Sequence, residues 1–309
     1  MRRPPPRPPG VTARTSISPA SAAWAIGSLI CPGGLLVFHL PPRKIGGEVP
    51  AGTAIAGPRH PPSWPRTARS GQAAGKAGWP WAGASEYDAA VNLLAPPRAR
   101  LTIEVVFDLV CPWCFLGIRR LRRMLRSRPD MAADLIWRPF LLNPDLAPQG
   151  VPRQEYLVRK FGGEERARRL HGTIAELGRA EGIDFRFDRI RRVPHSLDAH
   201  RLVRWATRFG AADAVIEALF EAYFTEGADI GDPGVLAMIA GRQGLDAIAA
   251  RRFLATVAEV EAVHSDNLRA HRLGINGVPC FVIAGRHAIA GAQEPEVLER
   301  LLDVALVDG

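Results

Sequence analysis

Between Leu101 and Ile118 the chain reads LTIEVVFDLVCPWCFLGI. From Leu101 to Phe107 every second residue is a large apolar one, and several side chains are β-branched. This pattern is typical of a strand with one buried face. After the two cysteines, apolar residues recur at helical spacing. Pro112 suits the first turn of that helix, because its missing N–H would be unpaired there in any case. The run therefore predicts a strand, a turn that places Cys111 at the N-cap, and a helix.

The remaining residues from position 99 onward alternate between strand and helix patterns. Further strand patterns occupy 134–139, 280–284 and 287–290. A strand–helix–strand order normally joins parallel strands through a right-handed crossover. Between about 152 and 273 the apolar residues follow helical spacing, and a last helix is predicted over 294–304. We therefore expect an α/β domain over 99–309, a small sheet split by a helical insertion.

Charge and cysteine content exclude several classes of protein. The chain has 40 Lys and Arg residues against 31 Asp and Glu, a net charge of +9. Residues 1–85 carry this whole excess, so the remainder is neutral and no nucleic-acid partner is expected. Four cysteines in 309 residues do not make a disulfide-stapled scaffold. The apolar stretch over 20–40 is broken by Pro32-Gly33-Gly34, so we predict no membrane-spanning helix and no membrane partner.

Residues 1–98 differ from the rest in composition. They hold 17 of the 27 prolines, and their apolar residues follow neither strand nor helix spacing, so we predict a disordered extension in which neither helix nor sheet forms. Three interpretations stay open: a true translation start further downstream, for example at Val91, a targeting segment, or a functional tail. If the extension is not a targeting signal, we expect a cytoplasmic protein.

Cys111-Pro-Trp-Cys114 is the strongest candidate for a reactive site. Two cysteines spaced by two residues at a helix start lie within disulfide reach, the first exposed at the N-cap and the second pointing inward. Unpaired N–H groups and the positive end of the helix dipole stabilise a thiolate on Cys111. A zinc half-site is the alternative, but it needs a second pair of ligands, and the chain offers Cys280 and scattered histidines. The strand before and the helix after the pair favour redox chemistry.

A second element precedes the strand at 280. It reads INGVPC over 275–280, and a proline that opens a strand after Gly-Val is unusual. A cis Val278–Pro279 bond would turn the chain sharply there and leave the Val278 backbone free to pair with an extended peptide.

Six motifs occur in the same order as in a known family. They are DLVCPWCFLG at 108–117, FLLNP at 140–144, AHRL at 199–202, LFEAYFTEG at 219–227, GINGVP at 274–279 and GAQ at 291–293. With them the chain resembles the DsbA-like branch of the thioredoxin superfamily, in particular the FrnE-like dithiol oxidoreductases, which are relatives of 2-hydroxychromene-2-carboxylate isomerase.

The resemblance implies a thioredoxin fold with a helical insertion and a cis bond before Pro279. It also implies that Cys111 is the attacking nucleophile, that Cys114 is the resolving thiol, and that Pro279 lies against them. Pro112, Trp113 and Val278 are then neighbours of the active site.

Two positions depart from the family pattern. Many relatives carry Thr where this chain has Cys280, which reads either as a small core residue or as a third redox thiol. Relatives often carry Asn where His195 stands, beside the site of the isomerases, so His195 is either a substrate-binding residue or a surface residue at a helix entry. His200 is expected to pack the insertion on the core.

These observations predict a thiol–disulfide oxidoreductase. It would act on thiol- or disulfide-containing proteins or small thiols, with no metal or organic cofactor and with glutathione as an optional co-substrate. One alternative is a glutathione-dependent isomerase of the 2-hydroxychromene-2-carboxylate type, although such isomerases typically have Ser where this chain has Cys111. The other is a non-enzymatic module in which the dithiol holds zinc or an iron–sulfur cluster.

Overall fold

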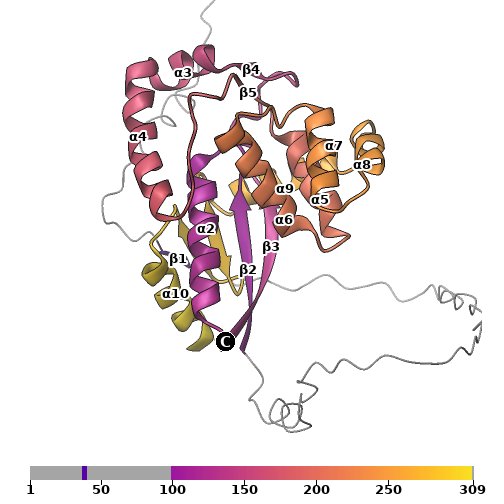
Figure 1. The fold of residues 1–309 in the computed structure, drawn as a ribbon. Helices are drawn as coiled ribbons and strands as arrows, with labels where there is room; N and C mark the ends of the chain where they lie inside the picture. Colours follow the sequence, from indigo (N-terminus) through magenta and orange to yellow (C-terminus); the bar gives the residue numbers. More distant parts are fainter. Residues whose placement is uncertain (1–36, 40–98, 308–309) are drawn as a thin grey trace, which may run out of the picture. The chain divides into compact units, whose positions relative to one another are not determined.

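The computed structural model describes residues 37–39 and 99–307. Its main sheet has five strands in the order β1-β7-β6-β2-β3 (Figure 1). The strands are β1 Val37–His39, β2 Ala99–Phe107, β3 Met131–Pro139, β6 Cys280–Ile283 and β7 His287–Ala290. The four strands of this sheet that follow residue 98 each overlap a segment that the sequence predicts as a strand.

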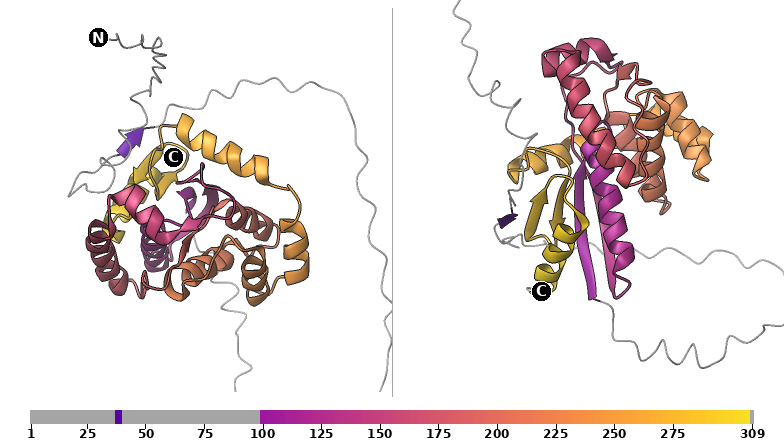
Figure 2. Two further views of the ribbon diagram at one scale, coloured as in Figure 1. Left: turned by 90° about the horizontal axis from the view of Figure 1, so that it is seen from above. Right: turned by 60° about the vertical axis from the view of Figure 1, so that its left-hand side comes forward.

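The two faces of this sheet pack against different helices. One face lies under α2 (Pro112–Ser127) and α10 (Pro295–Val307), so that Phe107 and Phe281 share a core cluster with Leu302. The other face carries Val106 and Val282, which share a second cluster with Ala270 of α9 (Val260–Arg272). Figure 2 shows the sheet enclosed between these helices. The alternation along β2 accounts for this division, since neighbouring side chains of a strand point to opposite faces.

The helices between β3 and β6 form the insertion. They are α3 Arg153–Phe161, α4 Glu164–Ala180, α5 Leu197–Thr207, α6 Ala212–Glu221, the π-helical turn η3 Ala222–Glu226, α7 Pro233–Arg242, α8 Ala247–Leu254 and α9. A short antiparallel pair, β4 (Val151–Pro152) with β5 (Arg192–Val193), accompanies them. The side chains of Asp232 and Asp246 cap α7 and α8 by accepting hydrogen bonds from backbone N–H groups, which satisfies donors that a helix start leaves unpaired.

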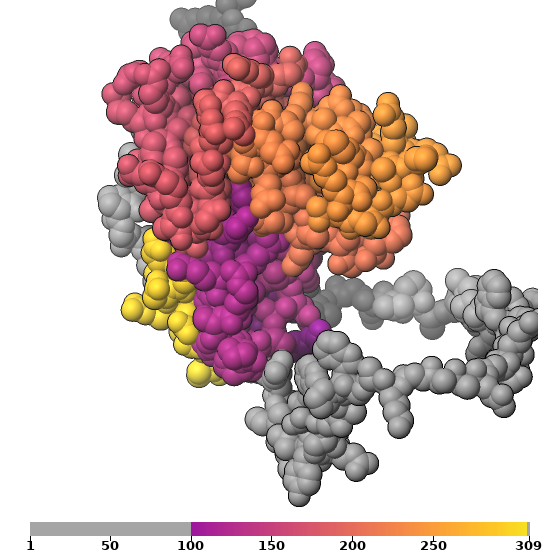
Figure 3. Space-filling model, viewed as in Figure 1, coloured from indigo at the N-terminus to yellow at the C-terminus, as the bar shows by residue number. Residues whose placement is uncertain are grey.

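Aromatic rings of the insertion pack against the end of β2 and the start of α2. Phe115, in the first turns of α2, stacks on Phe220 of α6 with ring centroids 5.0 Å apart. Phe107 at the end of β2 meets His200 of α5 edge-on at 5.2 Å. In the space-filling view the insertion, in red and orange, covers one end of the magenta α2 (Figure 3). The end that it covers is the one that begins at the Cys111 turn.

Strand β1 lies in the segment that was predicted to form no sheet. Its residues, Val37–His39, pair with β7 in antiparallel register, with Val37 opposite Ile289. The prediction is wrong for these residues, because a Val-Phe-His run without proline or glycine can add to an open strand edge even where its surroundings lack a repeating pattern. The other residues of the extension lie outside the described ones. Over residues 37–39 and 99–307, no helix is both long and apolar enough to span a bilayer.

An aromatic cluster joins α3 and α4 to the segment before α5. His171 of α4 stacks on Phe187 with ring centroids 4.2 Å apart, and Phe187 stacks on Phe185 at 5.1 Å. The Arg153 guanidinium approaches His171 Nδ1 at 3.3 Å. Burial, and next the charge of Arg153, lower the pKa of His171 to about 4.

This depressed pKa predicts that acid weakens the fold before the carboxylates titrate. Below about pH 6.5 the unfolded chain binds a proton at His171, whereas the folded chain binds it only near pH 4. The contribution of His171 to the free energy of unfolding is therefore fully present above about pH 6.5 and is lost as the pH falls toward 4. We expect a loss of about 2 kcal/mol, discounted for the partial exposure of the ring. Urea unfolding at several pH values measures it.

The His171→Phe variant keeps the ring stacking and should lose most of this pH dependence. The His264→Gln variant, at an exposed position on α9, serves as the control and should keep it. An identical slope in the wild type and in His171→Phe would contradict the assignment.

Candidate functional site

The two cysteines occupy the turn between β2 and α2. Cys111 is the N-cap residue and Pro112 opens the helix, as the sequence predicts. The Cys111 N–H donates to the Asp108 carbonyl at 3.1 Å, and the Cys111 carbonyl accepts from the N–H of Cys114 at 3.0 Å. The Cys111 side chain makes no capping hydrogen bond. Its sulfur therefore makes no hydrogen bond to the N–H groups of its own helix, and it lies at the positive end of the helix dipole.

Both thiols are more buried than a surface turn would suggest. Cys111 is 5 % exposed and Cys114 is 0 % exposed, and both are free thiols. The prediction of an exposed Cys111 is therefore wrong. Its physical reason is the loop before β6, which covers the turn, while Pro112 and Trp113 are half-buried beside it.

That loop contains a cis peptide bond between Val278 and Pro279, which confirms the prediction. The register of β6 on β2 pairs Cys280 with Val106, so the residues before Cys280 reach the same end of the sheet as the Cys111 turn. Cys111 Sγ donates to the Val278 carbonyl at 3.6 Å. The structure thus brings together Cys111, Cys114, Val278 and Pro279.

A glycine makes this close approach feasible. A Cβ at Gly117 would lie 2.9 Å from Pro279 Cγ and 3.2 Å from the Ala292 Cα. On the opposite side, the Pro279 carbonyl accepts from the Gly291 N–H at 2.7 Å. Pro279 is therefore held between α2 and the segment after β7, and any larger residue at position 117 would collide with its ring.

The environment of Cys114 favours its protonated form. Burial, followed by the neighbouring Cys111 sulfur, raises the pKa of the Cys114 thiol well above its ordinary value, and a hydrogen bond with the Asp108 backbone only partly opposes this. At neutral pH Cys114 is thus a thiol, while Cys111 lies at the helix end that stabilises a thiolate. The two sulfurs therefore lie in different environments, one fully buried and the other at the N-cap.

Asp108 and His200 lie next to the dithiol, although no chemical role is predicted for either from the sequence. Both are 0 % exposed, and His200 Nε2 lies 3.3 Å from Asp108 Oδ1. The sequence does mark Asp108, as an acidic residue that follows an apolar strand and lies three residues before the first cysteine. It does not mark His200 as the neighbour of Asp108, because His200 comes from the distant insertion.

Cys280 is separated from the dithiol. It lies in the second core cluster, with Val106 and Ala270, on the α9 side of the sheet. It is 3 % exposed, and burial raises its pKa to about 12. These features favour the interpretation as a small core residue over that of a third redox thiol.

His195 occupies the entry of α5. Its Nδ1 accepts from the Leu197 N–H at 3.2 Å, and its Nε2 lies 3.3 Å from the Pro144 carbonyl. The ring therefore links the start of α5 to the loop after β3, and these contacts are made with backbone atoms rather than with the dithiol.

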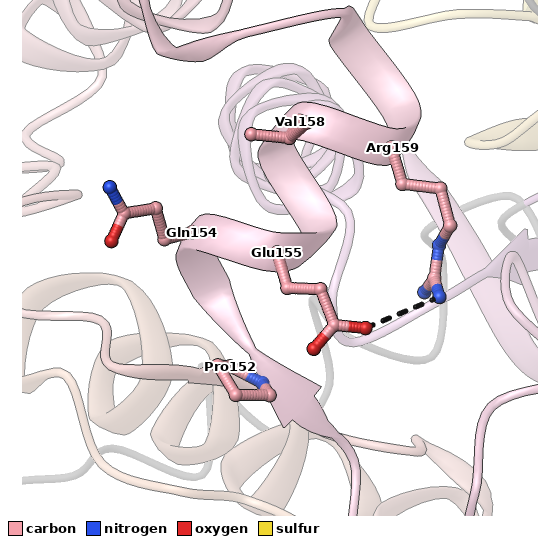
Figure 4. Close-up of a pocket in the computed structure, with 5 residues that line it drawn as sticks. All are labelled: Pro152, Gln154, Glu155, Val158 and Arg159. Atoms are coloured by element: carbon pink, nitrogen blue, oxygen red, sulfur yellow. Dashed lines mark ion pairs between the residues drawn. The ribbon is translucent and has the colours of Figure 1, made fainter.

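A shallow surface hollow lies elsewhere. It is an open depression beside α3 lined by Pro152, Gln154, Glu155, Val158 and Arg159, and Glu155 and Arg159, one turn apart on α3, form an ion pair at 3.7 Å (Figure 4). None of these residues belongs to the dithiol site. Within residues 37–39 and 99–307, no three His, Cys, Asp or Glu side chains group as metal ligands would.

Comparison with known families matches residues 102–303 to the DSBA-like thioredoxin domain. The chain belongs to this family. Its architecture is accordingly a thioredoxin fold that carries a helical insertion, and it is a DsbA-like oxidoreductase domain at the level of the family.

Individual relatives agree with this assignment. A probable DsbA oxidoreductase from Streptomyces coelicolor superposes with a TM-score of 0.63 at 29 % identity, over 68 % of this chain and 91 % of that one. A 2-hydroxychromene-2-carboxylate isomerase shares the fold with a TM-score of 0.52 at 17 % identity, over 65 % and 94 % of the two chains. The uncharacterised protein YwbO of Bacillus subtilis is 24 % identical over 205 residues, 65 % of this chain and 94 % of YwbO.

Two helical glycines give a test of the packing at Pro279. Gly117→Ala should lower the free energy of unfolding by about 1–3 kcal/mol, because the added methyl group meets Pro279 at 2.9 Å. Gly172→Ala in α4 is the matched control, since nothing lies within 4 Å of its added Cβ. It should stabilise the protein by up to about 1 kcal/mol through helix propensity. Both variants are compared by guanidinium unfolding. If the two substitutions changed the free energy of unfolding equally, the close packing of position 117 on Pro279 would be contradicted.

Proposed function

We propose that the protein is a thiol–disulfide oxidoreductase in which Cys111 is the nucleophile and Cys114 the resolving thiol. The observation that carries the proposal is the position of Cys111: it is the N-cap of α2, its sulfur lies 3.6 Å from the Val278 carbonyl, and Cys114 lies in the first turn of the same helix. A helix start stabilises a thiolate, and a thiolate is the species that attacks disulfides.

The reaction runs in two exchanges. The Cys111 thiolate attacks one sulfur of a substrate disulfide, a Cys111–substrate disulfide forms, and the other substrate sulfur leaves as a thiolate. Cys114 then loses its proton and attacks Cys111 Sγ. The Cys111–Cys114 disulfide forms and the second substrate sulfur leaves reduced. Run in reverse, the enzyme disulfide oxidises a dithiol substrate.

The residues around the dithiol have supporting roles in this proposal. The Val278 backbone, next to the cis bond, is suited to pair with an extended peptide that carries the substrate cysteine. Pro112 and Trp113, half-buried in the turn, border the position of the attacking sulfur. Substrates are proteins or small molecules with a disulfide or thiol, and glutathione is a candidate co-substrate.

Cysteine variants of the full chain test the proposal. Reduction of insulin by dithiothreitol should be lost in Cys111→Ser, because Cys114 is buried and protonated. Cys114→Ser should instead accumulate a mixed disulfide on Cys111, visible by intact mass. The matched control is Cys280→Ser, a third buried thiol on the other face of the sheet, which should keep the activity.

Full activity of Cys111→Ser would overturn the proposal. Metal bound to protein that is purified without oxygen would favour the alternative of a metal- or cluster-binding module. Turnover of a chromene carboxylate with glutathione would favour the isomerase.

A further inference from the structure

The two exchanges do not use Arg120, a buried arginine on α2. Arg120 is 4 % exposed and follows Gly117 by three residues, so the two positions share one face of the helix. A charge that is removed from water is costly unless it is paired and hydrogen-bonded. The partners of Arg120 therefore indicate what this charge holds in place.

The Arg120 guanidinium contacts three separate parts of the chain. Nε donates to Glu181 Oε1 at 3.2 Å, and Glu181 is the C-cap residue of α4 in the insertion. Nη1 donates to the Ala292 carbonyl at 2.8 Å, in the segment after β7. Nη2 pairs with Oε1 of Glu294, the residue before α10, at 2.7 Å. A guanidinium can hold three such partners at once, because its donors point in fixed directions.

Glu181 is the buried end of this arrangement. Its side chain is as buried as that of Arg120, and it also accepts a hydrogen bond of 2.8 Å from Arg123 Nη2. The Glu294 side chain is exposed, so solvent weakens its pairing with Arg120. The Arg120–Glu181 pair therefore fixes the guanidinium, and the fixed guanidinium holds the Ala292 carbonyl through a charge-assisted hydrogen bond.

The segment that this guanidinium holds, residues 291–293, lies directly behind the cis-proline. The Gly291 N–H donates to the Pro279 carbonyl at 2.7 Å. A Cβ at Gly117 would meet both Pro279 Cγ, at 2.9 Å, and the Ala292 Cα, at 3.2 Å. Pro279 and the segment behind it therefore rest on the same place on α2, one turn before the arginine that fastens the segment.

These contacts form a continuous series from the insertion to the active-site loop. In order, the series consists of Glu181, Arg120, Ala292, Gly291, Pro279 and Val278. Every step in it is a hydrogen bond or a peptide bond. The last member, Val278, is the residue whose carbonyl lies 3.6 Å from the Cys111 sulfur.

We propose that Arg120 is a positioning residue for peptide substrates, because it holds residues 291–293, and through them the Val278–Pro279 loop, where an extended substrate backbone pairs with Val278. The inference rests on the proposed function. A small disulfide has no extended backbone and does not use this support. Arg120 therefore determines the preference for peptide over small-molecule disulfides and leaves the chemistry of Cys111 unchanged.

A merely structural role for Arg120 makes a different prediction. A general loss of stability reduces the amount of folded protein, so it lowers the rate with every substrate alike. A displaced Val278–Pro279 loop affects only those substrates that pair with it through their backbone. The ratio of the two rates, with a peptide and with a small disulfide, separates the two roles.

The experiment compares two substrates that have the same reactive bond. One is a short extended peptide whose central cysteine is joined through a disulfide to thionitrobenzoate, and the other is N-acetylcysteine amide joined in the same way. The Cys111 thiolate attacks the cysteine sulfur, the substrate S–S bond breaks, and coloured thionitrobenzoate leaves as a thiolate. Initial rates with the reduced full-length protein, carrying Cys31→Ser in every variant, give the half-saturating concentration and the maximal rate.

Three substitutions on α2 make the comparison. Arg120→Met keeps an unbranched apolar side chain and removes all donors, whereas Arg120→Lys keeps the charge on a single ammonium. Arg119→Met is the matched control, since Arg119 is the neighbouring arginine and its partners, Glu217 and Glu221, belong to α6. It removes ion pairs between α2 and the insertion without touching those of Arg120.

We expect Arg120→Met to raise the half-saturating concentration of the peptide about tenfold, the effect of one lost hydrogen bond to a charged group, with the maximal rate unchanged. Arg120→Lys should raise it less, and Arg119→Met should leave it at the wild-type value. The rate with the N-acetylcysteine amide disulfide should be the same in all four proteins.

The outcomes separate the inference from the proposed function. An unchanged half-saturating peptide concentration in Arg120→Met, or an equal fall in rate with both substrates, overturns the inference and leaves the oxidoreductase intact. A wild type that releases no thionitrobenzoate from either substrate overturns the proposed function itself. If Arg120→Met does not fold, its combination with Glu181→Gln removes the buried carboxylate left behind and carries the same expectation.

Discussion

The approach of the Val278–Pro279 loop to the N-terminus of α2 is the contact on which the site depends. Cys111 is the N-cap of α2, and its sulfur meets the Val278 carbonyl at 3.6 Å. These residues are 167 positions apart in the chain. The antiparallel register of β6 on β2 brings them to the same end of the sheet, and Gly117 leaves the space that Pro279 fills.

The helical insertion completes this site from the other side. Phe220 stacks on Phe115 just after the dithiol, and His200 reaches the Asp108 carboxylate just before it. The insertion therefore does more than cover the sheet. Its helices pack around the start of α2, where Cys114 is fully buried, and this burial raises the pKa of the Cys114 thiol.

Local patterns in the sequence were sufficient for the strand, the turn and the helix around the dithiol. Pro112 and the spacing of apolar residues determine that Cys111 is the N-cap, because these are short-range effects. The separation of Cys280 from the dithiol follows equally from strand alternation.

Features that depend on distant residues could not be read in this way. The burial of Cys111 comes from the cis-proline loop, and the pairing of Asp108 with His200 comes from a helix about ninety residues later, which no local pattern encodes. The strand at Val37–His39 is a similar case. Its neighbours in sequence discourage sheet formation, whereas the open edge of β7 favours it.

Equilibration of the intact protein with glutathione buffers of defined ratio, followed by mass mapping of its disulfides, tests whether Cys111 and Cys114 form a redox-active pair. We expect one reversible disulfide, between Cys111 and Cys114, whose population follows the ratio of oxidised to reduced glutathione. A chain in which these two cysteines never pair under oxidising buffers, or in which Cys111 pairs with Cys280 instead, would contradict it.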